Sequence, residues 1–262
     1  MNKNKILKEL IVEIYNISKM NNYPIVIQSN LFPLIEKKVL TTSSDVKKLM
    51  LEILNIFSKR TLLMPTFINY LSKKELENGI INLDNLKCST GVLNEEFRKF
   101  KFSSRTISPT QPWSVTGKYK NHLINLKPKI EWGENSILEW MQKNNVQIIM
   151  IGENKVNNVL KHRVEFMNKK IINYRKMIKF NRKIIVNKKK YTINQNYFGI
   201  KKNVKEPNYE ILWKKSFLKN CRTKIINGLE VNTYCALEYI DEFEKKLKKD
   251  LKKINKITLQ NY

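Results

Sequence analysis

The sequence predicts an α/β fold, in which three α/β/α layers are built around a mixed central sheet with long functional loops. Short aliphatic or β-branched runs at 23–27, 61–64 and 146–151 alternate with segments whose apolar residues recur at helical spacing. Two further runs flank the polar stretch 187–190, which predicts an antiparallel hairpin and makes the sheet mixed. Strands that alternate with helices are typical of a sheet covered by helices on both faces.

The first half of the chain predicts a helix, a strand, a second helix and a second strand in turn. Apolar residues recur every three or four positions over 6–14, which favours a helix before the first strand. Ser44 and Asp45 are suited to cap a helix over 46–57. Between about 68 and 117 the periodicity is lost and Asn, Ser, Thr and Pro accumulate, so long ordered loops are expected there. Long loops in a compact α/β domain usually carry function.

The second half predicts a helix around 137–141, the strand 146–151 and a turn at Gly152. A terminal helix is expected over 233–251, with one apolar face formed by Ala236, Leu237, Ile240, Phe243 and Leu247. The sequence contains no internal repeat and no clear domain boundary. One domain over 1–262 is therefore expected, with a more divergent basic lobe from about residue 170.

Charge is the strongest compositional signal, with a net +27 of which residues 161–262 carry +18. The excess either follows from an overall enrichment in Lys, Asn and Ile, or it indicates an anionic partner such as nucleic acid, a membrane surface or a phosphorylated ligand. No apolar stretch approaches the ~20 residues that span a bilayer, and charges interrupt the first twenty residues, so neither a membrane span nor an export signal is expected. Three cysteines without CxxC spacing favour a reducing, cytoplasmic location.

His162 and Glu165 form the clearest candidate for catalytic chemistry. An i,i+3 spacing on a helix places both side chains on one face, where the carboxylate can fix the imidazole tautomer and raise its basicity. Such a histidine is suited to act as a general base. A surface or core histidine has the same local pattern. His122 lacks such a partner, and with so few histidines and no cysteine cluster we expect no metal site.

A series of short motifs surrounds this pair in a fixed order. The fragments are VIQSNL at 26–31, TLLMPTF at 61–67, STGVLNEEFR at 89–98, RTISP at 105–109 and HRVE at 162–165. Over about residues 25–180 the series resembles the aminoglycoside 3-N-acetyltransferase family, whose patterns run roughly as HSSL, TLxMPTF, SxxGxLxExFR, RSxHPxxS, GxxSP and NTxxHxxE. The shared order is more specific than any one fragment, and the last third of the chain matches loosely.

The resemblance implies a coenzyme-A-dependent N-acyltransferase that uses acetyl-CoA or another short acyl-CoA, without a metal. His162 matches the family's catalytic histidine, Glu165 its supporting acid, and Thr66 a threonine near the pantetheine end, where a hydroxyl can stabilise an oxyanion. The residues that match cofactor-facing segments are Gln28, Ser29, Asn30, Leu31, Arg105, Thr106 and Ser114. For Thr66 and Ser114 the alternative is a turn cap, and for Arg105 a structural ion pair.

Four departures from the family pattern bear on the substrate. Gln28 and Ser108 replace histidines, and Val159 replaces the threonine three residues before the catalytic histidine. Ser114 lies further beyond Pro109 than the family spacing allows. These changes leave the base in place and are compatible with a different amine.

The charge of the chain also bears on the acceptor. A protein at +27 repels polycationic aminoglycosides at long range unless a local acidic patch intervenes, and it attracts a pyrophosphate. We therefore expect direct transfer, in a ternary complex, to a nucleotide-linked amino sugar in surface-polysaccharide biosynthesis. The alternatives are an aminoglycoside acceptor, as in antibiotic resistance, a family member that has lost catalysis, and a nucleic-acid-binding protein whose tryptophans stack on bases. The oligomeric state is left open.

Overall fold

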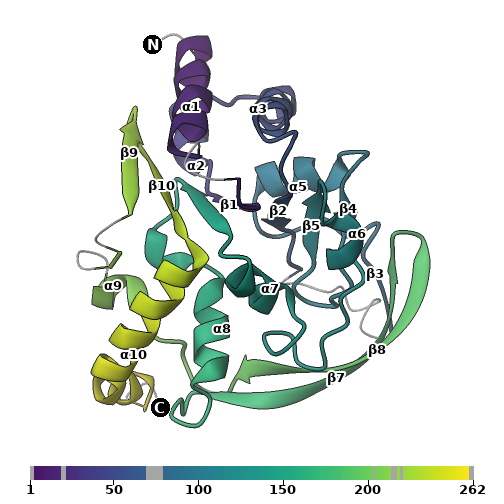
Figure 1. Cartoon of the computed structure of the whole chain (residues 1–262), viewed down its shortest axis with the longest axis vertical. Helices are drawn as coiled ribbons and strands as arrows, with labels where there is room; N and C mark the ends of the chain where they lie inside the picture. The colour runs from purple at the N-terminus through teal and green to yellow at the C-terminus, as the bar shows by residue number, and fades with distance from the viewer. Residues whose placement is uncertain are drawn as a thin grey trace.

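A seven-stranded mixed sheet forms the centre of the molecule (Figure 1). The computed structural model describes residues 3–18, 22–68, 79–202, 204–213, 217–218 and 221–259, with side chains up to Ile254. The strand order is β4-β5-β2-β1-β6-β10-β9. The strands of this sheet are β1 (Ile25–Ser29), β2 (Leu62–Pro65), β4 (Ser104–Arg105), β5 (Trp113–Thr116), β6 (Gln147–Ile151), β9 (Arg222–Ile226) and β10 (Leu229–Cys235).

The middle of the sheet is parallel and its two sides are antiparallel. β1 pairs in parallel with β2 on one side and with β6 on the other. β5 then pairs antiparallel with β2, and β10 pairs antiparallel with β6. The predicted mixed sheet is therefore confirmed, and the three parallel strands bring their carboxyl ends to one edge.

Helices cover both faces of the sheet, which confirms the three-layer α/β/α prediction. Alternation along β1 sends Ile25 and Ile27 into one apolar core and Val26 into the other. The first core is covered by α1 (Lys3–Ser18), α3 (Ser43–Ile56) and α5 (Val92–Lys99), and the second by α7 (Ile137–Lys143), α8 (Leu160–Met167) and α10 (Ala236–Leu259). The short helical segments are α2 (Phe32–Glu36), α6 (Lys120–Leu123), η1 (Lys155–Asn157) and α9 (Tyr209–Trp213).

The α3 helix begins at Ser43, three residues before the predicted range 46–57. Thr42, rather than Ser44, is its N-cap. The Thr42 hydroxyl accepts from the backbone N–H of Asp45 at 3.2 Å, and the Asp45 carboxylate accepts from the N–H of Thr42 at 3.0 Å. This reciprocal capping box satisfies two backbone donors that the first helical turn leaves without partners.

A second, three-stranded sheet contains the predicted hairpin. It consists of β3 (Ile80–Asn82), β7 (Arg175–Val186) and β8 (Lys189–Ile200), and in Figure 1 the hairpin follows the lower edge of the molecule as a long curved ribbon. The turn is shorter than 187–190, because Val186 already pairs with Lys189. Asn187 and Lys188 both have positive φ, at 51° and 61°, as a two-residue type I′ turn requires.

The expectation of long loops over 68–117 was too broad. α5 and the strands β3, β4 and β5 all lie in this stretch, while residues 69–78 fall outside the described part of the chain. The strands β9 and β10 were not predicted, and the terminal helix begins at Ala236 instead of residue 233. Leu237 is 41% exposed and does not belong to the buried face that the other four named residues form. Within the described residues, no helix is both long and apolar enough to cross a bilayer.

Candidate active site

The carboxyl-terminal edge of the parallel strands holds the loop that follows β1. The N–H of Asn30 donates to the carbonyl of Ile151 at 2.8 Å, which ties this loop to the end of β6. Gly152 comes next, with a φ of 68°, and a Cβ there would lie 2.2 Å from the Asn30 carbonyl oxygen. Only glycine fits so close to another backbone, and the two loops are therefore held together at the edge where α/β sheets bind ligands.

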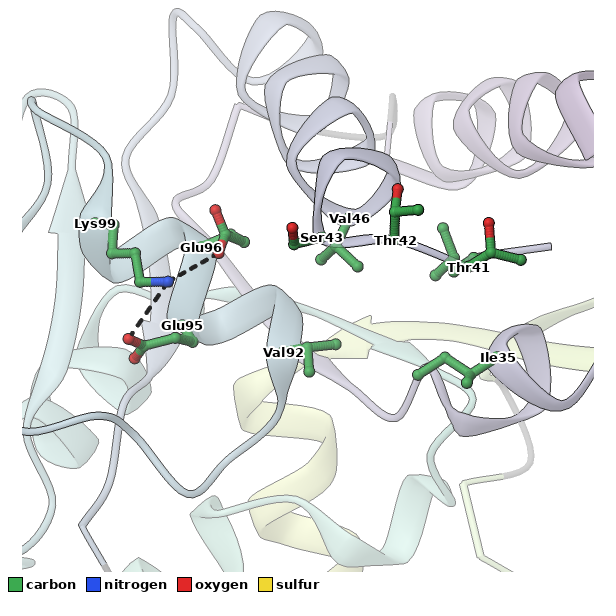
Figure 2. A pocket seen from close by; sticks show the side chains of 10 residues that line it. Ile35, Thr41, Thr42, Ser43, Val46, Val92, Glu95, Glu96 and Lys99 are labelled. Atoms are coloured by element: carbon green, nitrogen blue, oxygen red, sulfur yellow. Dashed lines mark hydrogen bonds and ion pairs between the residues drawn. The ribbon is translucent and has the colours of Figure 1, made fainter. Parts of the chain in front are cut away.

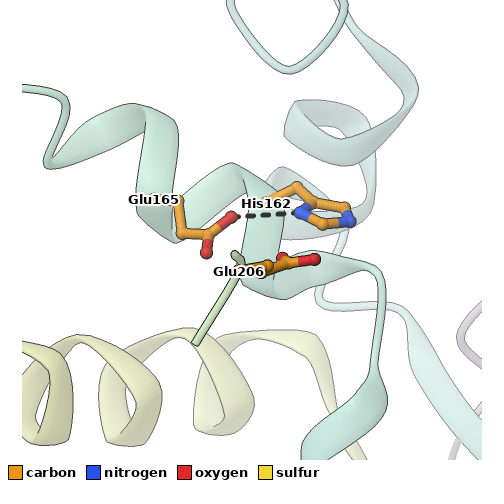
Figure 3. Close-up of side chains that lie close together, drawn as sticks. All are labelled: His162, Glu165 and Glu206. Atoms are coloured by element: carbon orange, nitrogen blue, oxygen red, sulfur yellow. Dashed lines mark hydrogen bonds and ion pairs between the residues drawn. The ribbon is translucent and has the colours of Figure 1, made fainter. Parts of the chain in front are cut away.

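His162 and Glu165 meet on one face of α8, as their spacing predicts. His162 Nδ1 lies 3.0 Å from Glu165 Oε2 (Figure 3). A carboxylate can only accept hydrogen bonds, so we assign the neutral imidazole's proton to Nδ1. The lone pair then resides on Nε2, the ring nitrogen directed away from Glu165. This is the tautomer that a general base needs.

Glu165 is a fully buried carboxylate with several donors and one cation. The hydroxyls of Tyr174 and Tyr209 donate to Oε1 at 2.6 and 3.0 Å, and Arg175 Nε lies 3.0 Å from Oε2. Burial raises the pKa of Glu165, but Arg175, the His162 hydrogen bond and Tyr174 more than offset it and bring the pKa to about 2. Glu165 therefore stays charged at any pH at which the enzyme would work.

His162 itself is held in its neutral form. Its side chain is 16% exposed and stacks on Trp132, with ring centroids 4.5 Å apart and planes 12° from parallel. Burial lowers the pKa of His162, Glu165 raises it, and Arg175 and Lys161 lower it, with a net lowering. A neutral imidazole at neutral pH is ready to accept a proton from a substrate amine.

Glu206 completes a group of three metal-type ligands with His162 and Glu165, whose ligand atoms lie within 4.8 Å of one another (Figure 3). Arg175 already lies among them. It forms ion pairs with Glu165 at 3.0 Å and with Glu206 at 2.5 Å. Because a guanidinium neutralises both carboxylates, this group is better described as an ion-pair network than as a cation site.

Ser29, Asn30 and Leu31 line a cavity of about 370 Å³. Its other walls are Phe32, Ile35, Ser89, Thr90, Gly91, Val92 and Glu153. Gln28 is not in this lining. Its side-chain oxygen accepts from the backbone N–H of Val159 at 3.3 Å, which links β1 to the start of α8.

A second cavity, of about 350 Å³, adjoins the first and shares Ile35 and Val92 with it. Figure 2 shows it between the start of α3, the short α2 and α5, with Thr41, Thr42 and Ser43 on one wall. On the opposite wall Lys99 pairs with Glu96 at 3.0 Å. The shared residues make the two cavities neighbours along one side of the molecule.

Thr66, Arg105, Thr106 and Ser114 come together in a buried polar cluster instead of lining either cavity. The Arg105 guanidinium donates to the carbonyls of Thr66, Leu83 and Leu86, and its Nε donates to the Thr66 hydroxyl at 3.3 Å. Within the described residues its partners are therefore neutral oxygens, and not the ion pair that was the alternative. Thr66 donates to the Pro112 carbonyl at 3.0 Å, and Ser114 donates to Thr66 at 3.3 Å.

Thr106 takes part through its hydroxyl, which accepts from the N–H of Trp113 at 2.9 Å. All four side chains of this cluster are nearly or fully buried. Their roles toward the cofactor or an oxyanion stay predictions.

Ser108, at a position where the family pattern has histidine, lies beside the catalytic face. Its hydroxyl donates to the buried carboxyl of Glu131 at 2.8 Å. Burial raises the pKa of Glu131 to about 7. The next residue is Trp132, on which His162 stacks. Ser108 is therefore bonded to the residue that precedes Trp132, the ring on which His162 stacks.

The sequence analysis missed the residues that surround the His162–Glu165 pair. Tyr174, Arg175, Glu206 and Tyr209 follow α8 in the chain without a recognisable motif, and only the fold brings them to it. Trp132 was considered as a base-stacking residue, but it and the other three tryptophans are buried, each at most 9% exposed. The four tryptophans are therefore not available to stack on bases.

Comparisons with known proteins identify the family of this chain. A sequence model of the aminoglycoside 3-N-acetyltransferase family matches residues 46–215. A search of curated protein sequences finds no match. Among solved structures, AAC-VIa bound to sisomicin is similar at 11% identity and a TM-score of 0.72, covering 93% of this chain and 97% of that one.

Two other solved structures give the same picture. The YokD protein from Bacillus subtilis is 16% identical, with a TM-score of 0.68 and coverage of 95% and 98%. AAC-IIIb in its binary complex with CoASH is 12% identical, with a TM-score of 0.64 and coverage of 93% and 96%. At such identities the likeness establishes the fold, and the family model covers well over half of the chain. The chain belongs to the aminoglycoside 3-N-acetyltransferase family, and it is an acyl-CoA-dependent N-acyltransferase for which acetyl-CoA is the donor.

Proposed function

We propose that this enzyme transfers the acetyl group of acetyl-CoA to an amino group of an amino sugar, with His162 as the general base. The observation that carries the proposal is the contact of His162 Nδ1 with the buried, charged Glu165, which leaves Nε2 as the proton acceptor. Nε2 takes a proton from the acceptor amine while the amine nitrogen attacks the thioester carbonyl. The C–S bond then breaks, the amide forms, and the proton passes from the imidazolium to the departing thiolate.

Glu165 stabilises the imidazolium that forms in this step, because its negative charge lies 3.0 Å from Nδ1. The donor is proposed to lie in the cavity lined by Ser29, Asn30 and Leu31. Gln28, which precedes this loop, hydrogen bonds the first turn of α8. Through Gln28, the proposed donor loop at residues 29–31 is therefore linked to the start of the helix that carries His162.

We place an aminoglycoside first among the acceptors, which reverses the order that the net charge suggested. Family membership favours it, and the similar AAC-VIa was solved with sisomicin. A carboxylate beside the donor cavity supports a cationic acceptor. Glu153 lines this cavity, and burial and then the nearby charge of Glu210 raise the pKa of Glu153.

A nucleotide-linked amino sugar is the second candidate, supported by the charge of the long hairpin. Strands β7 and β8 and their turn, residues 175–200, contain eight Lys or Arg and no Asp or Glu. The hairpin starts at Arg175, within the candidate site. A pyrophosphate near the acceptor amine would be attracted to such a surface.

The acceptor class can be tested by measuring CoA thiol release from acetyl-CoA with a panel of aminoglycosides and nucleotide-linked amino sugars. We expect amine-dependent release with aminoglycosides, and kcat/KM far above the rate without an amine. Release confined to the nucleotide-linked sugars would support the second candidate instead. No release with any amino sugar would contradict the proposed function.

A further inference from the structure

Arg175 is a buried cation in contact with the base itself. Its side chain is 3% exposed, at the first position of β7. One terminal nitrogen lies 3.2 Å from His162 Nδ1, and the same nitrogen donates to Glu206 at 2.5 Å. The other terminal nitrogen donates to the Phe198 carbonyl at 3.2 Å, which anchors the guanidinium on β8. The group also lies over the Trp132 ring, 5.1 Å from its centroid.

The contact with Glu165 is a charge interaction. Arg175 Nε lies 3.0 Å from Glu165 Oε2 but makes no aligned hydrogen bond. The hydrogen bonds to this carboxylate come from His162, Tyr174 and Tyr209. Arg175 therefore balances the charge of Glu165 without competing with His162 for the same lone pair.

That balance matters for a general base. A buried carboxylate 3.0 Å from an imidazole favours the imidazolium, which has no lone pair to accept a proton. Charged or titratable groups from four segments face this pair. They are Lys161 on α8, Tyr174 just before β7 and Arg175 at its start, Glu206 and Tyr209 from the segment after β8, and Tyr239 on α10. Lys161 pairs with Glu206 at 3.6 Å, and Tyr174 and Tyr209 are kept protonated by burial and by the charge of Glu165.

We propose that Arg175 is a positioning residue for the acyl transfer: it holds in place the Glu165 carboxylate that fixes the Nδ1 proton, and its charge keeps the His162 imidazole neutral. The inference rests on the proposed role of His162 as base. It adds a residue that the family motifs do not contain, and it gives the electrostatic reason why a histidine paired with a buried carboxylate remains able to accept a proton.

The sign of the expected change follows from the charges. Arg175 opposes a second proton on His162, so its removal raises the pKa of His162 and increases the protonated fraction of the base at a given pH. In Arg175→Met we expect the acidic limb of the pH profile of kcat/KM to shift to higher pH by roughly one unit or more. At pH values below the pKa of His162, this shift lowers kcat/KM about tenfold. The loss shrinks as the pH rises past the new pKa.

The test is an NMR titration of the imidazoles in histidine-labelled protein, because the chain has two histidines and His162→Ala assigns their signals. We expect the pKa of His162 to rise in Arg175→Met, to stay nearer the wild-type value in Arg175→Lys, and not to rise in Glu206→Gln. Arg182→Met is the matched control. It removes an exposed arginine from the same strand and should leave the titration unchanged.

An unchanged His162 titration in Arg175→Met, or the same rise in Arg182→Met, would overturn the inference. If Arg175→Met does not fold, a rise in Glu206→Gln would overturn it, since loss of a negative charge cannot raise a histidine pKa by this mechanism. The titration is read without substrate, so it is separate from the proposed function. Loss of activity in His162→Ala tests whether His162 is the base. The pKa shift of His162 in Arg175→Met tests whether Arg175 keeps that base neutral.

Discussion

At the scale of single residues, two buried carboxyl groups near His162 have pKa shifts of opposite sign. Glu165 has a cation and three hydrogen-bond donors, and its pKa falls to about 2 despite burial. Glu131 has the Ser108 hydroxyl as a donor but no ion pair within the described residues, and burial raises its pKa to about 7. The difference arises from what the fold places beside each group.

Glu131 should therefore make the stability of the protein depend on pH. Its pKa of about 7 in the folded state exceeds the ordinary 4.5, so the folded protein binds the proton more tightly and loses stability as the pH rises from 4.5 to 7. Glu131→Gln removes this loss, and we expect it to gain up to about 3 kcal/mol relative to wild type at pH 8 and little at pH 5. Urea unfolding at the two pH values measures it, and an equal difference at both would contradict the assignment.

Of the residues that contact Glu165, only His162 could be predicted from the sequence. The i,i+3 pair of His162 and Glu165 follows from helical periodicity alone. Arg175 and Tyr209 lie 10 and 44 residues beyond Glu165 and reach it because the β7–β8 hairpin and α9 return to α8. Arg105 is a converse case, because its sequence context resembles a cofactor contact while its donors bind three backbone carbonyls and the Thr66 hydroxyl.

At the scale of elements, α8 carries both members of the proposed catalytic pair, and its start is held by side chains from outside the helix. The Asn158 side chain accepts from the N–H of Leu160 at 2.8 Å and donates to the Tyr234 hydroxyl at 3.1 Å. Gln28 accepts from the N–H of Val159. These bonds satisfy backbone donors that have no partner within the helix.

Asn158→Ala should therefore lower both stability and turnover. Loss of the cap leaves a buried N–H unsatisfied, which costs about 1–2 kcal/mol of unfolding free energy. The His162–Glu165 pair also loses its fixed position, so kcat should fall more than KM changes. Asn157→Ala is the control, since Asn157 is exposed and donates to Glu210 instead. Thermal unfolding and steady-state kinetics compare the two variants, and equal effects would refute this role for Asn158.

The strands differ in how far the sequence revealed them. The central strands are short apolar runs that are buried on both faces, and all three were predicted. β9 was missed because four of its five residues are exposed, so no apolar run marks it. A signal was nevertheless present, since Asn227 and Gly228 form a turn with positive φ of 50° and 81° between β9 and β10, and Asn-Gly is a strong hairpin signal.

At the scale of the whole molecule, charge and fold point to different acceptors. The net charge of +27 led the sequence analysis to an anionic, nucleotide-linked sugar. Membership of the aminoglycoside 3-N-acetyltransferase family led us to propose an aminoglycoside instead. Net charge is a property of the full surface, whereas an acceptor meets only the groups that line the site. The single domain over 1–262 and the cytoplasmic location stay predictions.

The central claim is that His162 is the base of an acyl transfer from CoA, and a matched pair of histidine variants tests it most directly. His122 is exposed and lies on the short α6, while His162 is mostly buried on α8. With acetyl-CoA and the best amine of the panel, we expect His162→Ala to lower kcat by roughly 10²–10⁴-fold and His122→Ala to leave it unchanged. If the two variants turn over the amine at the same rate, His162 is not the base.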